Sequence, residues 1–144
     1  MEIQKIVTGM LDENCYVLKS NGTCLVVDPG DDYIKIKEAI GEDKVLGILL
    51  THSHFDHVGA LRHFLTKRSI KIFKKSSVEK QEYHIGDFIF KDSVGRCDLP
   101  GGSEQELKES LSKIKTYPSD ITLYPGHYEV TTLEEEMNNN PYFR

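Results

Sequence analysis

The sequence predicts a single α/β domain over residues 1–144, with strands and helices arranged in layers. Segments rich in β-branched and aromatic residues alternate with segments of helical periodicity, and no repeat or low-complexity linker separates them. A length of 144 residues suits one domain. The apolar fraction of 38% and the charged fraction of 28% are typical of a globular chain with one hydrophobic core.

The first 30 residues predict three strands. Ile3–Val7 alternates loosely, whereas Asn14–Leu18 and Thr23–Val27 are rich in residues that favour strands. Asn21-Gly22 tolerates the positive φ angles of a tight turn, so we expect the second and third strands to form a hairpin. Asp28-Pro29-Gly30 then ends the third strand.

A helix and a buried strand follow. Apolar side chains approximate a helical face over residues 31–40, and Gly41 is a suitable C-cap. Val45–Leu50 is continuously apolar, which is typical of a strand buried on both faces. After a cluster of histidines, Val58–Lys67 predicts a second helix.

The rest of the chain predicts more strands and two more helices. Ser103 and Glu106 form a capping-box pattern, and Leu107, Leu111 and Ile114 follow at helical spacing. The other expected elements are strands at 70–73, 83–90 and 121–124 and a short acidic helix at 132–138.

Charge and cysteine content narrow the range of partners. A net charge of -5 argues against nonspecific binding to nucleic acid or to anionic membranes. The longest apolar run, Val45–Leu50, is too short to span a bilayer, and the N-terminus lacks the pattern of a signal peptide. Cys15, Cys24 and Cys97 are unevenly spaced, as in a protein with reduced thiols. We therefore expect a cytoplasmic protein with a small-molecule substrate.

Four side chains with metal-binding groups lie within six residues directly after the apolar strand: His52, His54, Asp56 and His57. Imidazole and carboxylate groups are ligands that Zn²⁺ and related divalent ions prefer. In extended backbone, residues two apart project to the same side, so His52 and His54 can converge on one ion. Surface histidines on a loop are the alternative, but a strand end before a helix is a common active-site position in α/β proteins.

Several stretches together resemble the metallo-β-lactamase fold superfamily, and within it the short, single-domain proteins similar to glyoxalase II (hydroxyacylglutathione hydrolase). These stretches span nearly the whole chain: Asn14-Cys15-Tyr16, Val27-Asp28-Pro29-Gly30, Thr51–Gly59, Gly86-Asp87, Ser93–Gly102, Tyr124–His127 and Thr131–Tyr142. The resemblance implies an αββα sandwich and two metal sites. It assigns His52 and His54 to the first ion, Asp56, His57 and His127 to the second, and Asp87 as the bridge between them. A turn aspartate at Asp87 and a loop histidine at His127 are the alternatives.

The resemblance also implies a metal-dependent hydrolase, with thioesters as the expected substrates. Two zinc ions are expected, with one ion, iron or manganese as alternatives. Metal coordination lowers the pKa of water and gives a metal-bound hydroxide as the nucleophile, which Asp56 would orient and could deprotonate. Arg96 stands where relatives place a basic residue that contacts an anionic substrate, and a surface arginine without that role is the alternative.

The substrate itself is open at this point. Relatives use the same metal core on lactones, β-lactams and phosphodiesters and in iron-based oxygen chemistry, and the fold does not choose among them. The sequence ends at Arg144 without the C-terminal helical region through which larger glyoxalase II proteins bind glutathione. Glutathione is therefore less expected as part of the substrate.

One ligand of the resembled family is missing. Relatives carry a further first-site histidine in a Thr-Pro-Gly-His-type loop, followed by a strand pair, before the bridging aspartate. Only 29 residues separate His57 from Asp87, and they contain no such loop. A deletion between two similar Gly-Asp stretches would leave Gly86-Asp87 as a hybrid. His84 is the spare imidazole near this joint and could replace the lost ligand, with His63 as a weaker candidate.

The apparent deletion has two expected consequences. His52, His54 and Asp87 plus a water can still form a catalytic centre, so an active hydrolase and a degenerate or weakly active metal-binding protein both fit the sequence. The loss of a strand pair should also expose sheet edges, which a homodimer would cover.

Overall fold

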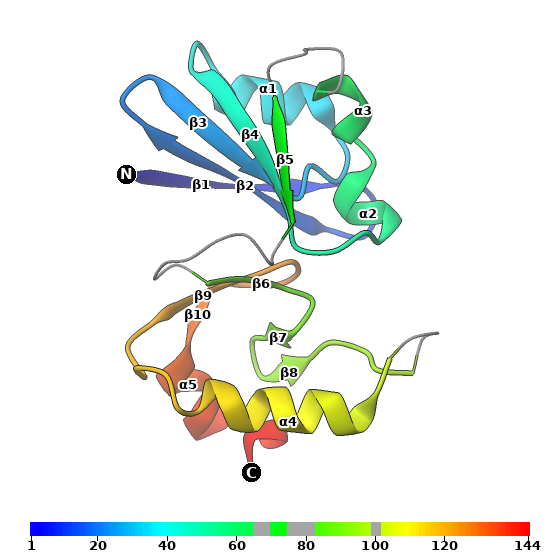
Figure 1. The fold of residues 1–144 in the computed structure, drawn as a ribbon, viewed down its shortest axis with the longest axis vertical. Helices are drawn as coiled ribbons and strands as arrows, with labels where there is room; N and C mark the ends of the chain where they lie inside the picture. Colours follow the sequence, from blue (N-terminus) through cyan, green and yellow to red (C-terminus); the bar gives the residue numbers. More distant parts are fainter. Residues whose placement is uncertain (65–69, 75–82, 99–101) are drawn as a thin grey trace. The chain divides into compact units, whose positions relative to one another are not determined.

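A computed structural model of the chain describes residues 1–64, 70–74, 83–98 and 102–144 (Figure 1). The chain divides into two compact units, Met1–Glu79 and Lys80–Arg144. Each unit has its own cluster of buried apolar side chains. The expectation that the whole chain forms one domain stays a prediction.

The first unit contains a five-stranded mixed sheet. Its strands are β1 (Glu2–Thr8), β2 (Glu13–Ser20), β3 (Thr23–Val27), β4 (Lys44–Leu50) and β5 (Lys71–Lys74). They are ordered β1-β2-β3-β4-β5, with β1, β2 and β3 antiparallel and β3, β4 and β5 parallel. Asn21 and Gly22 join β2 to β3 with φ angles of 49° and 73°, which confirms the predicted turn.

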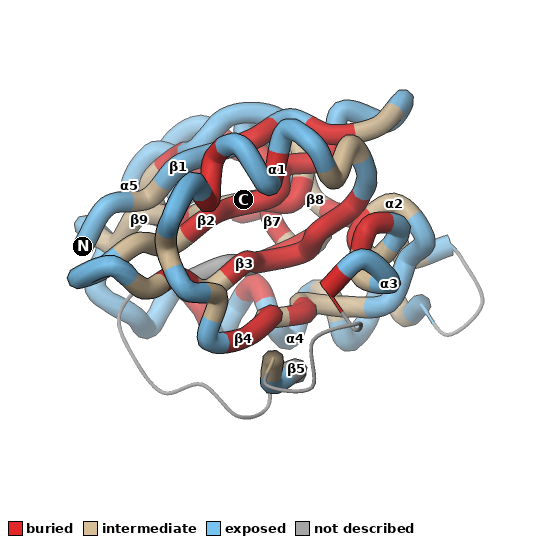
Figure 2. Tube along the Cα trace, turned by 90° about the horizontal axis from the view of Figure 1, so that it is seen from above, coloured by how far each residue is buried: buried red, intermediate tan, exposed pale blue. Residues whose placement is uncertain are grey.

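A helix after β3 contributes to the core of the first unit. α1 (Tyr33–Ile40) lies across a face of the sheet and places Ile36 and Ile40 in the buried cluster (Figure 1). It ends at Gly41, whose φ is 61° and whose N–H donates to the Lys37 carbonyl, so the predicted cap is confirmed. Figure 2 shows long buried stretches in β2 and β3, the strands at the centre of this packing.

The helix expected at Val58–Lys67 is wrong in its extent. The structure has two short helices in this region, α2 (Phe55–Val58) and α3 (Leu61–Phe64). Residues 65–67 of the expected helix lie outside the described part of the chain.

The break between α2 and α3 has a cause in the neighbouring loop. The N–H of Ala60 donates to the carbonyls of Pro29 (3.0 Å) and Gly30 (2.8 Å) and so leaves the helical pattern. A Cβ at Gly59 would collide with the Gly30 carbonyl, so the two segments can meet only because residue 59 is glycine. These contacts hold α2 against the loop after β3.

The second unit combines short strands with two helices. Its elements are β6 (Tyr83–Gly86), β7 (Ile89–Phe90), β8 (Ser93–Val94), α4 (Glu104–Ile114), β9 (Thr122–Pro125), β10 (Thr131–Thr132), α5 (Leu133–Asn139) and the 3₁₀ helix η2 (Pro141–Phe143). β6 runs parallel to β9, β10 is antiparallel to β9, and β7 and β8 form a hairpin.

The strand expected at residues 83–90 is interrupted. β6 ends at Gly86, which takes a φ of 52°, and the chain turns before β7 begins. The N–H of Gly95 donates to the Phe88 carbonyl (3.2 Å), and a Cβ at Gly95 would collide with the Asp87 carbonyl. The segment after β8 therefore closes directly over the turn that carries Asp87.

The helices of the second unit cover its core. Ser103 caps α4 by accepting the Glu106 N–H (3.2 Å), as the capping pattern predicted. Leu111, Leu123 and Leu133 meet in the buried cluster of this unit. Within the described ranges, no helix has the length and apolar character needed to cross a membrane.

Candidate metal centre

Two neighbouring parallel strands bring the first-unit side chains of the site together. Asp28 directly follows β3, and His52 comes two residues after β4. The carboxyl ends of adjacent parallel strands meet at one edge of a sheet, so the residues after them become neighbours. One ligand atom from each of Asp28, His52 and His57 lies within 4.8 Å of the others.

His52 and His54 face each other at this edge. The distance from His52 Nε2 to His54 Nδ1 is 3.0 Å, and the ring centroids are 4.5 Å apart. Two neutral imidazole nitrogens at this distance repel each other through their lone pairs unless a proton or a cation lies between them. A neutral His54 with its proton on Nδ1 meets this condition, and so does a cation held by both nitrogens.

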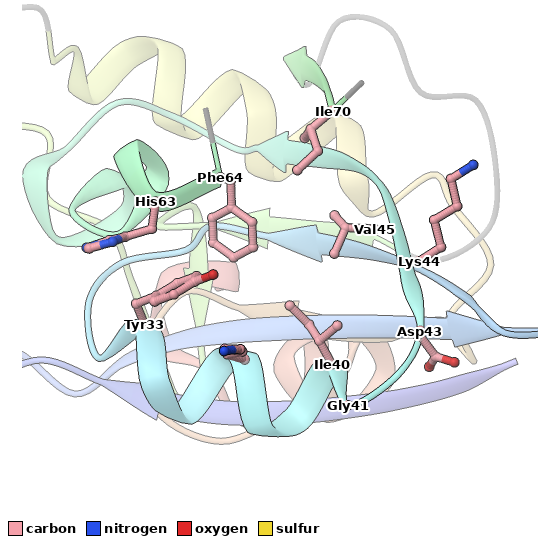
Figure 3. A pocket seen from close by; sticks show the side chains of 10 residues that line it. Tyr33, Ile40, Gly41, Asp43, Lys44, Val45, His63, Phe64 and Ile70 are labelled. Atoms are coloured by element: carbon pink, nitrogen blue, oxygen red, sulfur yellow. The ribbon is translucent and has the colours of Figure 1, made fainter. Parts of the chain in front are cut away.

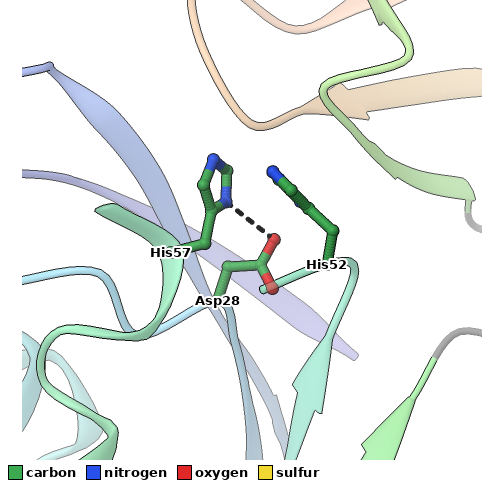
Figure 4. Close-up of side chains that lie close together, drawn as sticks. All are labelled: Asp28, His52 and His57. Atoms are coloured by element: carbon green, nitrogen blue, oxygen red, sulfur yellow. Dashed lines mark hydrogen bonds and ion pairs between the residues drawn. The ribbon is translucent and has the colours of Figure 1, made fainter. Parts of the chain in front are cut away.

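His57 is the buried member of the cluster. Its ring is fully buried and lies 4.2 Å from the ring of His52 between centroids (Figure 4). The Nδ1 atom is 3.1 Å from Asp28 Oδ2, the interaction drawn as a dashed line in Figure 4. On the other side of the ring, Nε2 is 3.7 Å from Asp56 Oδ2.

Thr51 holds Asp28 in place and links it to His52. The Thr51 backbone N–H donates to Asp28 Oδ1 (2.8 Å), and its hydroxyl donates to Asp28 Oδ2. The same hydroxyl oxygen is 3.0 Å from His52 Nδ1. It can therefore accept the His52 Nδ1–H while Asp28 accepts the His57 Nδ1–H. Both rings then keep a lone pair on Nε2, the form that a metal ligand requires.

The side chains at this edge fit a divalent cation. Imidazole nitrogen and carboxylate oxygen are ligands for zinc, iron and manganese. A carboxylate behind a metal-binding histidine is the usual support for its tautomer, and Asp28 stands in that position. The first unit thus carries four of the six expected ligand side chains, His52, His54, Asp56 and His57.

The other two expected ligands lie together in the second unit. Asp87 follows β6 and His127 follows β9, and these strands are parallel neighbours. The Gly126 N–H donates to the Gly86 carbonyl (3.0 Å), which holds the two loops together. As a result, His127 Nε2 is 3.7 Å from Asp87 Oδ1.

The three other residues singled out in the sequence analysis each have different neighbours. Arg96 is exposed and forms two hydrogen bonds of 2.9 Å with Asp98. His84 lies on β6 opposite Tyr124. His63 is exposed and its ring stacks on Tyr33, with centroids 4.6 Å apart.

Two buried acidic residues beside the histidines were given no role in the sequence analysis. Asp28 had two sequence signals: its position directly after a predicted strand, and its place in the Val27-Asp28-Pro29-Gly30 stretch that resembles the family. Glu13 had no signal beyond a charge at the start of an apolar strand. Burial raises the pKa of Glu13 to about 8, and its Oε1 is 3.7 Å from His57 Nδ1. The contacts of Asp28 and of Glu13 with His57 both join residues that are far apart in sequence.

A cavity of about 210 Å³ lies elsewhere in the first unit (Figure 3). Its lining includes Tyr33, Ile40, Val45 and Phe64, with Lys37 and Lys44. The described lining includes none of the four first-unit ligand side chains, so this cavity is distinct from the histidine cluster.

A family model matches the first half of the chain, and individual relatives match nearly all of it. The family model of the metallo-beta-lactamase superfamily matches residues 8–81. A protein of Aquifex aeolicus (strain VF5) is 30% identical, covering 99% of this chain and 97% of that protein. A probable metallo-hydrolase of Bacillus subtilis (strain 168) is 26% identical, with 99% and 97% covered. A hydroxyacylglutathione hydrolase of Haemophilus influenzae is 23% identical, with 99% and 98% covered.

These alignments run over 204, 205 and 207 residues, whereas this chain has 144. The chain is therefore shorter than its relatives and lacks a segment that they contain, as the sequence predicted.

Solved structures show the same fold. The BLEG-1 B3 metallo-beta-lactamase has a TM-score of 0.85 at 23% identity, covering 99% of both chains. TTHA1623 in a di-iron-bound form has a TM-score of 0.84 at 24% identity, covering 96% of this chain and 99% of that one. The predicted fold class is thus confirmed. From the family match, the similarity to the Aquifex protein and the fold, we conclude that this chain belongs to the metallo-beta-lactamase superfamily.

Proposed function

We propose that this protein is a metal-dependent hydrolase of thioesters. The observation that carries the proposal is the gathering of three imidazoles and the Asp56 carboxylate at the end of β4, with His57 backed by Asp28. Two relatives support it: one is named a probable metallo-hydrolase and another a hydroxyacylglutathione hydrolase.

We propose that two zinc ions are the resident metal and that Asp87 and His127 complete the ligand set. A bound divalent ion would lower the pKa of a coordinated water to about 7 and so supply a nucleophile at neutral pH. A ligand set rich in imidazole also suits iron, and one structural neighbour is in a di-iron-bound form. Iron and manganese therefore belong in the test beside zinc.

The residues around the ligands would position and move protons. Asp56 lies beside His57 Nε2, where its carboxylate can orient a water and accept its proton. Thr51 and Asp28 keep the rings of His52 and His57 in the tautomer with a free Nε2. Arg96 is exposed, so it can exchange Asp98 for an anionic group of the substrate.

The test removes all metal from the purified protein with a chelator and reloads it with Zn²⁺, Mn²⁺ or Fe²⁺. Mass spectrometry counts the bound ions, and a thiol reagent follows hydrolysis of a hydroxyacylglutathione thioester. We expect about two ions per chain and thiol release only with metal. His54→Ala should reduce the rate to background. His63→Ala is the matched control, because it removes an exposed histidine outside the ligand set and should leave the rate unchanged.

The second candidate is a degenerate or weakly active metal-binding protein of the same fold. It is favoured by the segment that the relatives contain and this chain lacks. One ion or none per chain, with no thiol release under any of the three metals, would support this candidate and contradict the thioesterase proposal. Two ions per chain without thiol release would also contradict the thioesterase proposal, and would direct the search to other esters.

We also propose a cytoplasmic location. All three cysteines are free, and Cys15 and Cys24 are buried in the first unit. Free thiols are typical of proteins in a reducing compartment.

A further inference from the structure

The cavity of about 210 Å³ in the first unit lies where β4 begins (Figure 3). Its lining includes residues of α1, of α3 and of the start of β4, together with Ile70, which directly precedes β5. His52 follows the other end of β4, and the seven residues of this strand span about 23 Å. The cavity and the histidine cluster are therefore two separate places in the same unit.

The inside of this cavity is apolar. Ile40 and Phe64 belong to the buried cluster of the first unit. Tyr33, Val45 and Ile70 line the same space and pack against that cluster. The rings of Tyr33 and Phe64 meet edge to face, with their centroids 5.3 Å apart. Because packed side chains surround the space, an apolar molecule can bury its surface there.

A hydroxyl group points into this apolar space. Figure 3 shows the hydroxyl of Tyr33 directed between the Phe64 ring and Ile40. Among the described residues, this hydroxyl has no hydrogen-bond partner. A tyrosine hydroxyl can donate a hydrogen bond, and a single polar group of this kind fixes the orientation of a ligand in an otherwise apolar site.

The uncompensated charges around the cavity are positive. Lys37 and Lys44 contribute to its lining, and within the described ranges neither ammonium group forms an ion pair. Asp43 also lines the cavity, but its carboxylate is paired with Lys19 at 3.1 Å. An anionic group on a ligand would therefore meet two free cations, whereas a cationic group would meet like charges.

We propose that this cavity is a second ligand site, which binds a small carboxylate with an apolar body, such as a short-chain fatty acid. The apolar body lies among Val45, Phe64 and Ile70. The carboxylate accepts hydrogen bonds from the Tyr33 hydroxyl and the Lys37 ammonium, which are one helical turn apart on the same face of α1. The inference is independent of the proposed function, because the described lining contains none of the four first-unit ligand side chains.

The size of the cavity limits the length of the ligand. Its volume lies below the ~300–1,000 Å³ of pockets that hold drug-sized molecules. Hexanoate is therefore the probe, and 1-hexanol and hexylammonium are matched probes with the same chain and a neutral or a positive head group. NMR spectra of the ¹⁵N-labelled protein, recorded during titration with each probe, report both the affinity and the place of binding.

We expect hexanoate to cause saturable shifts of the amide signals of residues 33–45. The neutral 1-hexanol should bind about 2- to 5-fold more weakly, because it lacks the attraction to the lysines. Hexylammonium should cause no shifts at these residues, because its charge is repelled by Lys37 and Lys44.

Two variants remove the proposed contacts with the carboxylate. Tyr33→Phe removes one hydroxyl and should weaken hexanoate binding about 2- to 10-fold, the value of one hydrogen bond. Lys37→Met removes the charge at an exposed position and should weaken hexanoate binding about 2- to 5-fold without affecting 1-hexanol. Lys35→Met is the matched control. Lys35 is on the same helix but is paired with Asp32 (2.6 Å) and does not line the cavity, so its variant should bind hexanoate as the wild type does.

Three results would overturn the proposal. The first is the absence of saturable shifts at residues 33–45 with hexanoate at millimolar concentration. The second is shifts confined to residues 52–57, which would show that hexanoate binds at the histidine cluster instead. The third is equal affinity for hexanoate and 1-hexanol together with no effect of Lys37→Met, which would show that the cavity does not select a carboxylate.

Discussion

The loop after β3 positions the side chains of the candidate site through the backbone conformation and the size of its residues. Asp28 has a φ of 45°, a left-handed conformation that aspartate tolerates better than most residues. In this conformation its carboxylate meets both Thr51 and His57. Gly30 has no side chain and leaves room for the Asp56 carbonyl. The backbone angles and sizes of these residues therefore decide where the ligand rings lie.

Gly30→Ala should lower both stability and metal affinity. The new Cβ would collide with the Asp56 backbone, which cannot move without shifting α2. We expect a loss of about 2–3 kcal/mol in the free energy of unfolding, measured with urea, and weaker zinc binding. Gly22→Ala is the control, because it has a positive φ of 73° but open space around it, and it should cost about 1 kcal/mol without affecting zinc. Equal effects of the two variants would contradict this account.

The buried Glu13 predicts a pH dependence of stability for the metal-free protein. Burial raises its pKa from 4.5 to about 8. Between these values the unfolded chain has released a proton that the folded protein keeps. The stabilising contribution is therefore complete below pH 4.5 and is lost as the pH rises to about 8, by on the order of 5 kcal/mol in total.

Glu13→Gln has no such proton to release. Its unfolding free energy in the presence of a chelator should gain on that of the wild type steadily as the pH rises from about 5 to 8. Urea titrations at several pH values would measure the difference. Parallel pH profiles for the two proteins would show that Glu13 ionises in the folded state as readily as in the unfolded chain.

At the scale of elements, local sequence patterns predicted the turns and helix ends whose structure depends only on residues adjacent in sequence. The turn at Asn21-Gly22, the cap at Gly41 and the start of α4 at Ser103 all follow from backbone preferences of those residues. The helix after the histidines was predicted too long, because Ala60 bonds to the carbonyls of Pro29 and Gly30. No local pattern reports such a distant partner.

The candidate site also combines features that local sequence patterns predicted with features that they did not. The spacing of His52, His54, Asp56 and His57 pointed to a metal cluster because those residues are close in sequence. The supporting contact between Asp28 and His57 spans 29 positions, and its geometry depends on β3 and β4 being neighbours. Sequence patterns alone did not supply that pairing.

The C-terminal elements depend on one buried amide. Asn140 donates to the Ser93 carbonyl (2.8 Å) and to Glu136 Oε2 (2.7 Å), and it accepts the Tyr142 N–H (3.0 Å). It thus ties α5 and η2 to the β7–β8 hairpin. Asn140→Ala should lower the unfolding free energy by about 2–3 kcal/mol, since it leaves buried groups without partners. The exposed neighbour Asn139→Ala should change it by less than about 0.5 kcal/mol in the same urea assay.

At the scale of the whole molecule, the expected ligands are divided between the two units. Four belong to the first unit and two, Asp87 and His127, to the second. Among the described strands, β5 and β6 each stand at the end of their sheet. Such edges can pair with another chain, which is the reason to expect a homodimer. The homodimer stays a prediction, and light scattering can check it.

A metal bound by ligands from both units should couple their unfolding. An ion that binds only the folded protein adds about 2.7 kcal/mol of stability at a concentration 100 times its Kd. If both units contribute ligands, calorimetry should show one transition with zinc that moves to lower temperature and separates into two when a chelator is added. His127→Ala should behave as the chelated protein even with zinc, because the second unit then loses its imidazole ligand. His63→Ala should behave as the wild type. Zinc that raises the transition of the first unit alone would show that the ion is bound without Asp87 and His127.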